Sequence, residues 1–337
     1  MLRDLNPEIA DYHAPSWLPG GHLQTLYPAL VLGGRPQLAF RRELWATPDD
    51  DEIATDWLDG PTDAPLVVLF HGLEGSSRSH YSLSLFQAAT ARNWRGVVPH
   101  FRSCGDITNK LPRAYHAGDS AEIDWVLRRI RQQYPDAPLF AAGVSLGGNA
   151  LLKWLGENGS AASQVIDGAA AVCAPMDLTA CGAVLDAGLN RQIYTREFLR
   201  TLKTKTLTKL KLHASTRIDR DALLRAKTLR EFDNLVTAPL HGFRNVDHYW
   251  QAASSKPHLI NIAVPTLIVS ARNDPFIPAH SLPTRMDVSA SVTLLQPQTG
   301  GHVGFASGRP PGQLAWLPDT LLKFFQAHLP ASRALHE

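Results

Sequence analysis

The chain has 337 residues, of which 44% are hydrophobic and 19% charged, and its formal net charge at neutral pH is +2. These proportions are typical of a globular protein that buries a large core, as one domain with an insertion or as two domains. A net charge so close to zero excludes the polycationic character typical of nucleic-acid-binding proteins, so no nucleic acid partner is expected.

Signals for targeting and for metal binding do not stand out in the sequence. The first eight residues, MLRDLNPE, contain no apolar stretch of a signal peptide, and no apolar run approaches the ~20 residues that span a bilayer. The three cysteines, Cys104, Cys173 and Cys181, have neither metal-ligand spacing nor a disulfide framework, which favours a reducing compartment. We therefore expect a cytoplasmic protein without metal or cofactor.

The predicted elements begin with an irregular arm over residues 1–35, which is rich in proline and glycine and includes one short helix at Leu23–Leu30. From residue 36 onward, apolar runs alternate with helical patterns. Strands are predicted at Gln37–Trp45, Glu52–Leu58, Leu66–Phe70, Gly96–Pro99, Leu139–Val144, Val165–Cys173, Thr266–Ser270 and Val292–Leu295. Helices are predicted at Ser79–Ala91, Ser120–Gln133, Leu146–Asn158 and Leu314–His328.

This alternation implies a mostly parallel twisted sheet with helices on both faces. In such a sheet, the binding crevice lies at the carboxyl ends of the strands. The alternation breaks once, over residues 176–257, where the pattern is helical and no convincing strand occurs. We interpret this stretch as a helical cap inserted into an α/β core formed by residues 36–175 and 258–337.

The predicted cap contains a strongly basic run. Residues 191–230 hold twelve Lys and Arg against three acids, a formal charge of +9, which leaves −7 for the rest of the chain. The run could be a solvated helix face, or it could attract anionic esters or the surface of an anionic membrane. The sequence leaves both interpretations open.

The clearest chemical motif is Gly143-Val144-Ser145-Leu146-Gly147, a match to the G-x-S-x-G nucleophile elbow. A buried strand is predicted before it and a helix after it. The sharp turn between them strains the backbone at Ser145 and crowds the positions two residues away, where glycine has no Cβ to clash. The motif therefore predicts a serine nucleophile lifted clear of the sheet.

A serine hydroxyl needs a base and an orienting acid, in the chain order Ser, Asp or Glu, His. His302 lies in a glycine-rich loop after the last predicted strand and is the preferred base. Asp274 follows the strand Thr266–Ser270 and is the preferred acid, with Asp177 after the preceding strand as the alternative. His302 follows Asp274 by 28 positions, a separation that would accommodate one helix and one strand.

Acyl transfer also requires donors for the developing oxyanion. The backbone N–H of Leu146, directly after the serine, is one candidate. The loop His71-Gly72-Leu73-Glu74-Gly75, directly after a predicted strand, favours the N–H of Leu73 as the other.

Seven stretches carry a family resemblance: residues 21–25 (GHLQT), 71–76 (HGLEGS), 101–105 (FRSCG), 143–149 (GVSLGGN), 237–243 (TAPLHGF), 273–276 (NDPF) and 300–305 (GGHVGF). The chain resembles the α/β-hydrolase superfamily, and more narrowly its YheT-like branch, which includes plant embryogenesis-associated hydrolases and mammalian lipid-acting relatives. The resemblance covers about residues 15–325 and departs at 101–105, where a second glycine is expected. It implies the α/β-hydrolase fold, a nucleophile at Ser145, a charge-relay pair at Asp274 and His302, and esterase activity on carboxylic esters.

The leading hypothesis is a serine hydrolase that cleaves carboxylic esters, including lipid-like or acyl substrates, through an acyl-enzyme. A thioesterase, amidase or acyltransferase would use the same triad. The alternative from another class is a non-catalytic lipid-binding module on a hydrolase fold.

Overall fold

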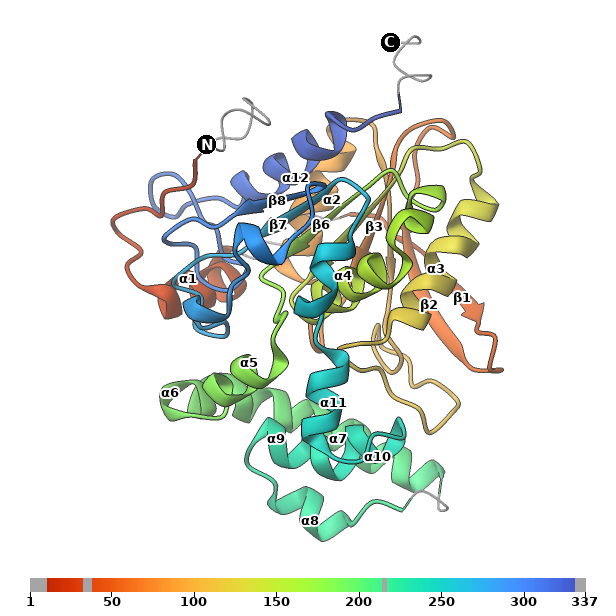
Figure 1. Cartoon of the computed structure of the whole chain (residues 1–337), viewed down its shortest axis with the longest axis vertical. Helices are drawn as coiled ribbons and strands as arrows, with labels where there is room; N and C mark the ends of the chain where they lie inside the picture. Colours follow the sequence, from red (N-terminus) through yellow and green to blue (C-terminus); the bar gives the residue numbers. More distant parts are fainter. Residues whose placement is uncertain (1–10, 33–37, 214–216, 331–337) are drawn as a thin grey trace.

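A computed structural model describes residues 11–32, 38–213 and 217–330 of the chain. Eight strands in this described part form one sheet in the order β1-β2-β4-β3-β5-β6-β7-β8 (Figure 1). Their bounds are β1 Arg41–Ala46, β2 Glu52–Leu58, β3 Leu66–Phe70, β4 Arg95–Pro99, β5 Leu139–Val144, β6 Gly168–Val172, β7 Thr266–Val269 and β8 Val292–Leu295.

The sheet is mostly parallel, as the alternating pattern predicts. Strand β2 is antiparallel to both β1 and β4, and every other neighbouring pair is parallel. The carboxyl ends of β3, β5, β6, β7 and β8 therefore lie at one edge, where the loops that follow them meet.

Helices cover both faces of the sheet, because its central strands bury both of their sides. On one face, Ala141 of β5 packs in a cluster with α3 (Ser120–Gln133) and α4 (Leu146–Asn158). On the other face, Phe140 packs in a cluster with α2 (His80–Thr90) and α12 (Trp316–Gln326). The predicted α/β-hydrolase architecture is confirmed.

Several element boundaries differ from those predicted. Strand β6 begins at Gly168 rather than Val165, because the Val165 and Ile166 amides donate to the Ala162 carbonyl and close a helical turn. The arm helix α1 spans Gly21–Tyr27 and continues as a π-helical turn at Pro28–Leu32. Strand β1 begins at Arg41, and the predicted start at Gln37 lies outside the described residues.

The connection from Asp274 to His302 also differs from the sequence expectation. The helix expected there is replaced by two single 3₁₀ turns, at Ala279–Ser281 and Arg285–Asp287, before β8. Each turn is only three residues long, and a proline stands at position 278 and another at 283, where no backbone donor is available to continue a helix.

Residues 178–253 form a group of helices below the carboxyl edge of the sheet (Figure 1). Its described residues include no strand. The helices are α5 Leu178–Leu185, α6 Gly188–Asn190, α7 Arg196–Leu212, α8 Arg220–Arg225, α9 Leu229–Phe232, α10 Ala238–Leu240 and α11 Val246–Ala253, with π-helical turns at Arg191–Thr195 and Asp233–Thr237. We refer to this group as the helical segment.

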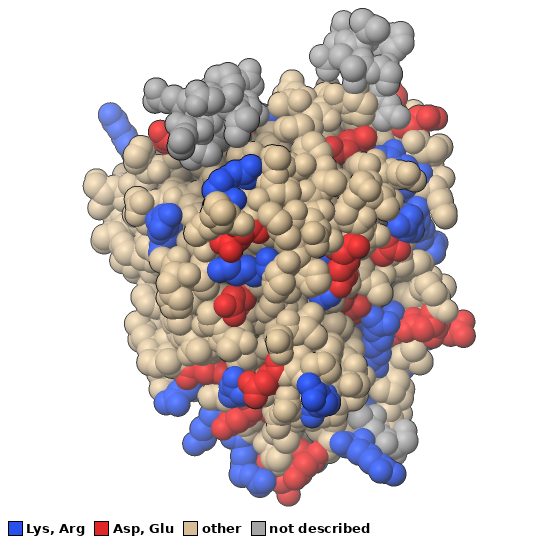
Figure 2. Space-filling model, in the orientation of Figure 1, with Lys and Arg blue, Asp and Glu red and all other residues tan. Residues whose placement is uncertain are grey.

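Apolar side chains hold the helical segment together. Leu199 of α7 packs with Leu223, Phe232 and Val236 in a small core of its own. On the face shown in Figure 2, basic side chains gather at the lower end of the molecule, with acidic side chains between them. No helix in the described part of the chain combines the length and apolarity needed to cross a membrane.

Candidate active site

Ser145 occupies a sharp turn between β5 and α4. Its backbone has φ 53° and ψ −120°, a conformation that L-residues rarely adopt. A Cβ on Gly147 would lie 2.4 Å from the Phe70 carbonyl oxygen, and one on Gly143 would lie 2.6 Å from the Gly147 oxygen. Only glycine fits at these two positions, so the motif glycines allow the close packing that the turn requires.

The structure brings Ser145, His302 and Asp274 together from three separate loops. The distance from Ser145 Oγ to His302 Nε2 is 3.0 Å, and that from His302 Nδ1 to Asp274 Oδ2 is 2.8 Å. A carboxylate can only accept, so Nδ1 carries the proton and Nε2 is free to accept from the serine hydroxyl. This arrangement is the one that a general base requires.

Asp274 is held in place by its own loop. The side chain is fully buried, and its Oδ1 accepts from the Phe276 amide at 2.7 Å, which leaves Oδ2 for the imidazole. The ring of Phe276 stacks on the His302 ring with centroids 4.0 Å apart. Both contacts restrict the orientation of the imidazole, and neither of them was predicted from the sequence.

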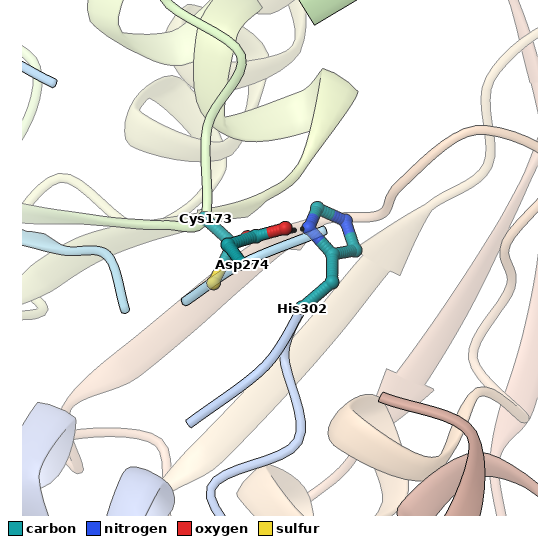
Figure 3. A group of neighbouring side chains, drawn as sticks. All are labelled: Cys173, Asp274 and His302. Atoms are coloured by element: carbon teal, nitrogen blue, oxygen red, sulfur yellow. Dashed lines mark hydrogen bonds and ion pairs between the residues drawn. The ribbon is translucent and has the colours of Figure 1, made fainter. Parts of the chain in front are cut away.

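Cys173, at the end of β6, lies beside this pair. The potential ligand atoms of Cys173, Asp274 and His302 lie within 4.8 Å of one another, and Figure 3 shows the carboxylate turned toward the imidazole. The Cys173 Sγ accepts from the Val303 amide at 3.3 Å, and burial raises the pKa of its thiol well above the ordinary value. Cys173 Sγ also lies 3.8 Å from the Gly301 carbonyl oxygen, so its contacts with the backbone on both sides of His302 pack the His302 loop against the end of β6.

Asp177, the alternative acid, has a different role in the structure. It is the N-cap of α5, and its Oδ1 accepts from the Ala180 amide at 3.0 Å. The structure thus places Asp274, and not Asp177, at hydrogen-bonding distance from His302.

The loop after β3 lies against the serine. A Cβ on Gly72 would lie 3.2 Å from the Ser145 Cβ. Two tyrosine hydroxyls, those of Tyr81 and Tyr115, accept from the Gly72 and Glu74 amides at 2.9 Å each. Between these two anchored amides, the N–H of Leu73 has no acceptor among the described residues, and neither has the N–H of Leu146. These two donors are therefore available to a ligand.

A lysine from the helical segment also contacts this loop. Lys205 of α7 donates to Glu74 Oε1 at 2.8 Å, and the same oxygen accepts from Tyr115 Oη at 2.8 Å. Lys205 Nζ also lies 3.4 Å from Cys104 Sγ. This pair was not predicted from the sequence, because a lysine in a basic run carries no signal that it turns inward.

A cavity of about 170 Å³ lies between the sheet edge and the helical segment, and it reaches Ser145, Leu146, Leu73 and His302. Its walls are mostly apolar. The helical segment contributes Leu185, Phe198, Leu202, Leu210, Phe232 and Val236. Such a lining suits an apolar group of a bound molecule.

Comparison with known proteins agrees with this architecture. Residues 65–308 match the family model described as alpha/beta hydrolase fold. The candidate esterase YheT of Escherichia coli (strain K12) is 37% identical over 319 residues, which are 91% of this chain and 91% of that protein. The phospholipase ABHD3 of Homo sapiens is 29% identical over 337 residues, which are 97% of this chain and 81% of that protein.

Among solved structures, an esterase of Pyrococcus furiosus, Pf2001, superposes with a TM-score of 0.56. The match covers 96% of this chain and 99% of that one, at 12% sequence identity. At this identity the likeness supports the fold alone.

Proposed function

Because the chain belongs to the alpha/beta hydrolase family, in its YheT-like branch, we propose that it is a serine hydrolase that cleaves carboxylic esters through a Ser145–His302–Asp274 triad. The observation that carries the proposal is the pair of hydrogen bonds that joins the three side chains, with Ser145 open to the cavity. The names of the relatives, an esterase candidate and a phospholipase, support an ester substrate.

The mechanism follows from this geometry. Ser145 Oγ attacks the ester carbonyl carbon while His302 Nε2 takes the hydroxyl proton, and Asp274 stabilises the imidazolium. The Leu73 and Leu146 amides donate to the oxyanion of the tetrahedral intermediate. Collapse of the intermediate expels the alcohol, which receives the proton from His302. A water molecule, deprotonated by the same imidazole, then releases the acid and restores Ser145.

The side chains that the helical segment contributes to the cavity favour one class of ester substrate. We assign residues 176–257 the role of a cap, because their helices supply one wall of the cavity that contains Ser145. The apolar side chains of that wall favour esters with a hydrophobic, lipid-like acyl group. Burial of each additional CH₂ contributes ~0.8 kcal/mol, so kcat/KM should rise with chain length until the cavity is full.

The test is labelling with a fluorophosphonate probe together with hydrolysis of p-nitrophenyl esters of increasing chain length. Ser145→Ala should keep the wild-type Tm, lose the label, and lose hydrolysis by a factor on the order of 10³ or more. Retention of more than about a tenth of wild-type turnover would refute the assignment. An unlabelled wild-type protein that binds the esters without cleaving them would instead identify a lipid-binding module.

A further inference from the structure

The segment Gly21-His22-Leu23-Gln24-Thr25 forms most of α1, and none of its residues takes part in the proposed chemistry. It also precedes residues 65–308, the part of the chain that matches the family model. Two of its side chains are nevertheless buried, since Gln24 is 3% exposed and Thr25 is 8% exposed. The large majority of buried polar side chains in proteins have specific hydrogen-bond partners.

Thr25 holds the backbone of His302 itself. The His302 amide donates to Thr25 Oγ1 at 2.8 Å, and the Thr25 hydroxyl donates to the Gly21 carbonyl at 2.7 Å. The second bond fixes the hydroxyl so that an oxygen lone pair faces the His302 amide. The two partners, Thr25 and His302, are 277 positions apart in the sequence.

Gln24 joins the loop of the acid to the loop of the base. Its Oε1 accepts from Asn273 Nδ2 and from the Gly300 amide, each at 2.9 Å. Its Nε2 donates to the Leu18 carbonyl at 2.8 Å, which fixes the orientation of the amide. Asn273 Oδ1 in turn accepts from the Gly301 amide at 3.0 Å, which closes the network on both sides.

Backbone packing leaves little room between these loops and α1. A Cβ on Gly304 would lie 1.8 Å from the Gln24 carbonyl oxygen, and a Cβ on Gly21 would lie 2.0 Å from the Asn273 carbonyl oxygen. The glycines therefore permit a direct approach of the His302 loop, residues 296–306, to α1. This loop has no helix or strand of its own, and its Gly300, Gly301 and His302 amides take their acceptors from other segments.

We propose that Gln24 and Thr25 are positioning residues for the reaction, which hold the loops of Asp274 and His302 in register so that the imidazole stays between the carboxylate and Ser145. The inference rests on the proposed function for its catalytic consequence, whereas its structural consequence can be measured in the resting protein. Removal of either side chain leaves buried amides of the His302 loop without an acceptor, and the loop then shifts to find water.

The primary experiment compares Thr25→Val with Thr25→Ser. Valine keeps the shape of the side chain but removes the acceptor, whereas serine retains it. Thr25→Val should lower kcat by about 10- to 100-fold, because small displacements of a catalytic group cost this much, with KM within about twofold of wild type. Thr25→Ser should stay within about threefold of wild type in kcat.

A second readout is independent of activity. The proton on His302 Nδ1, which donates to Asp274, should give a far-downfield ¹H resonance in the wild-type protein, and its absence in His302→Gln would assign it. The resonance should be lost or broadened by exchange in Thr25→Val and retained in Thr25→Ser. This result holds whether or not the wild-type protein hydrolyses esters, so failure of the proposed function and failure of this inference are distinguishable.

Thr90→Val is the matched control. Thr90 of α2 donates to the Phe86 carbonyl at 2.8 Å, the same contact four residues back that Thr25 makes, and among the described residues it has no hydrogen bond to the site. Thr90→Val should leave kcat and the His302 resonance unchanged. If Thr25→Val does not fold, Gln24→Met carries the same expectation. An unchanged resonance in the folded variant would overturn the inference, whether or not a kcat can be measured.

Discussion

The carboxyl edge of the sheet and the helical segment form opposite walls of one cavity, and their polar groups are organised differently. At the sheet edge, Ser145, Asp274 and His302 follow three parallel strands and meet through hydrogen bonds of 2.8 and 3.0 Å. In the helical segment, basic residues of one helix have different surroundings. Lys205 reaches inward to Glu74, whereas Arg196 and Arg200 of the same helix are exposed.

The position of a functional side chain has a different physical cause in each of the two regions. A side chain at the end of a parallel strand is placed by the sheet, since all such ends share one edge. A side chain on a helix is placed by the packing of that helix, and a shift of one position turns it by about 100°. The sheet edge should therefore control the chemical step, and the helical segment should affect stability and the position of the oxyanion loop.

The largest effect should come from exchanging the acid at the sheet edge for its amide. Asp274→Asn should lower kcat/KM by a factor on the order of 10³–10⁴, because the amide leaves His302 in the wrong tautomer. Asp177→Asn should change it less than about threefold, since asparagine is also a good N-cap for α5. Hydrolysis of one p-nitrophenyl ester by both variants, at matched Tm, checks the expectation. A larger loss in Asp177→Asn would show that the acid is misassigned.

The second effect concerns a buried carboxyl in the helical segment. Asp233 accepts from Thr237 Oγ1 at 2.6 Å and from Trp250 Nε1 at 2.8 Å, and no ion pair to it occurs among the described residues. Burial raises the pKa of this carboxyl from 3.8 to about 6. The folded protein therefore binds the proton more tightly than the unfolded chain does, and this stabilisation is complete below pH 3.8 and is lost as the pH rises through about 6.

Asp233→Asn should remove that pH dependence, because asparagine does not titrate. The measurement is the free energy of unfolding by urea at several pH values between 4 and 7, for both proteins. The wild-type value minus that of the variant should fall by at most about 3 kcal/mol over this range. If the wild-type free energy of unfolding minus that of the variant stays constant with pH, burial in the helical segment does not raise the pKa of the Asp233 carboxyl.

The smallest effect should come from the lysine that bridges the two regions. Lys205→Met should lower kcat by about three- to tenfold, because the loop that carries Leu73 loses its ion pair from α7. Lys203 makes a matched control, since in the described part of the chain its Nζ donates only to the Leu224 and Ala226 carbonyls within the helical segment. Lys203→Met should change kcat less than twofold. Assays with neutral and anionic esters at 0.1 and 1 M NaCl would separate this contact from steering of the substrate.

In that experiment, a contact between Lys205 and Glu74 predicts the same loss for neutral and anionic esters at both salt concentrations, because a partly buried pair is screened weakly. Steering by the basic run predicts equal losses in both lysine variants, for anionic esters alone, that disappear at high salt. The second outcome would contradict the assignment of Lys205 to the loop.

The sequence alone determined the features that depend on neighbouring residues. The serine turn was predictable because strand, glycines and helix are contiguous in residues 139–158, and the parallel sheet because its elements alternate along the chain. The candidacy of Asp274 followed from its place directly after β7. The prediction of a helix between Asp274 and His302 was wrong. The short turns found there depend on proline positions and on packing, and not on hydrophobic periodicity.

Only the tertiary structure decided the contacts between distant segments. No local pattern relates Thr25 to His302, Gln24 to Gly300, or Lys205 to Glu74, because each pair meets only after the sheet has brought its edge beside α1 and α7. A basic run likewise does not show which of its lysines turn inward. The physical reason is that local propensity acts over a few residues, whereas a buried donor takes whichever acceptor the packed fold places within hydrogen-bonding distance.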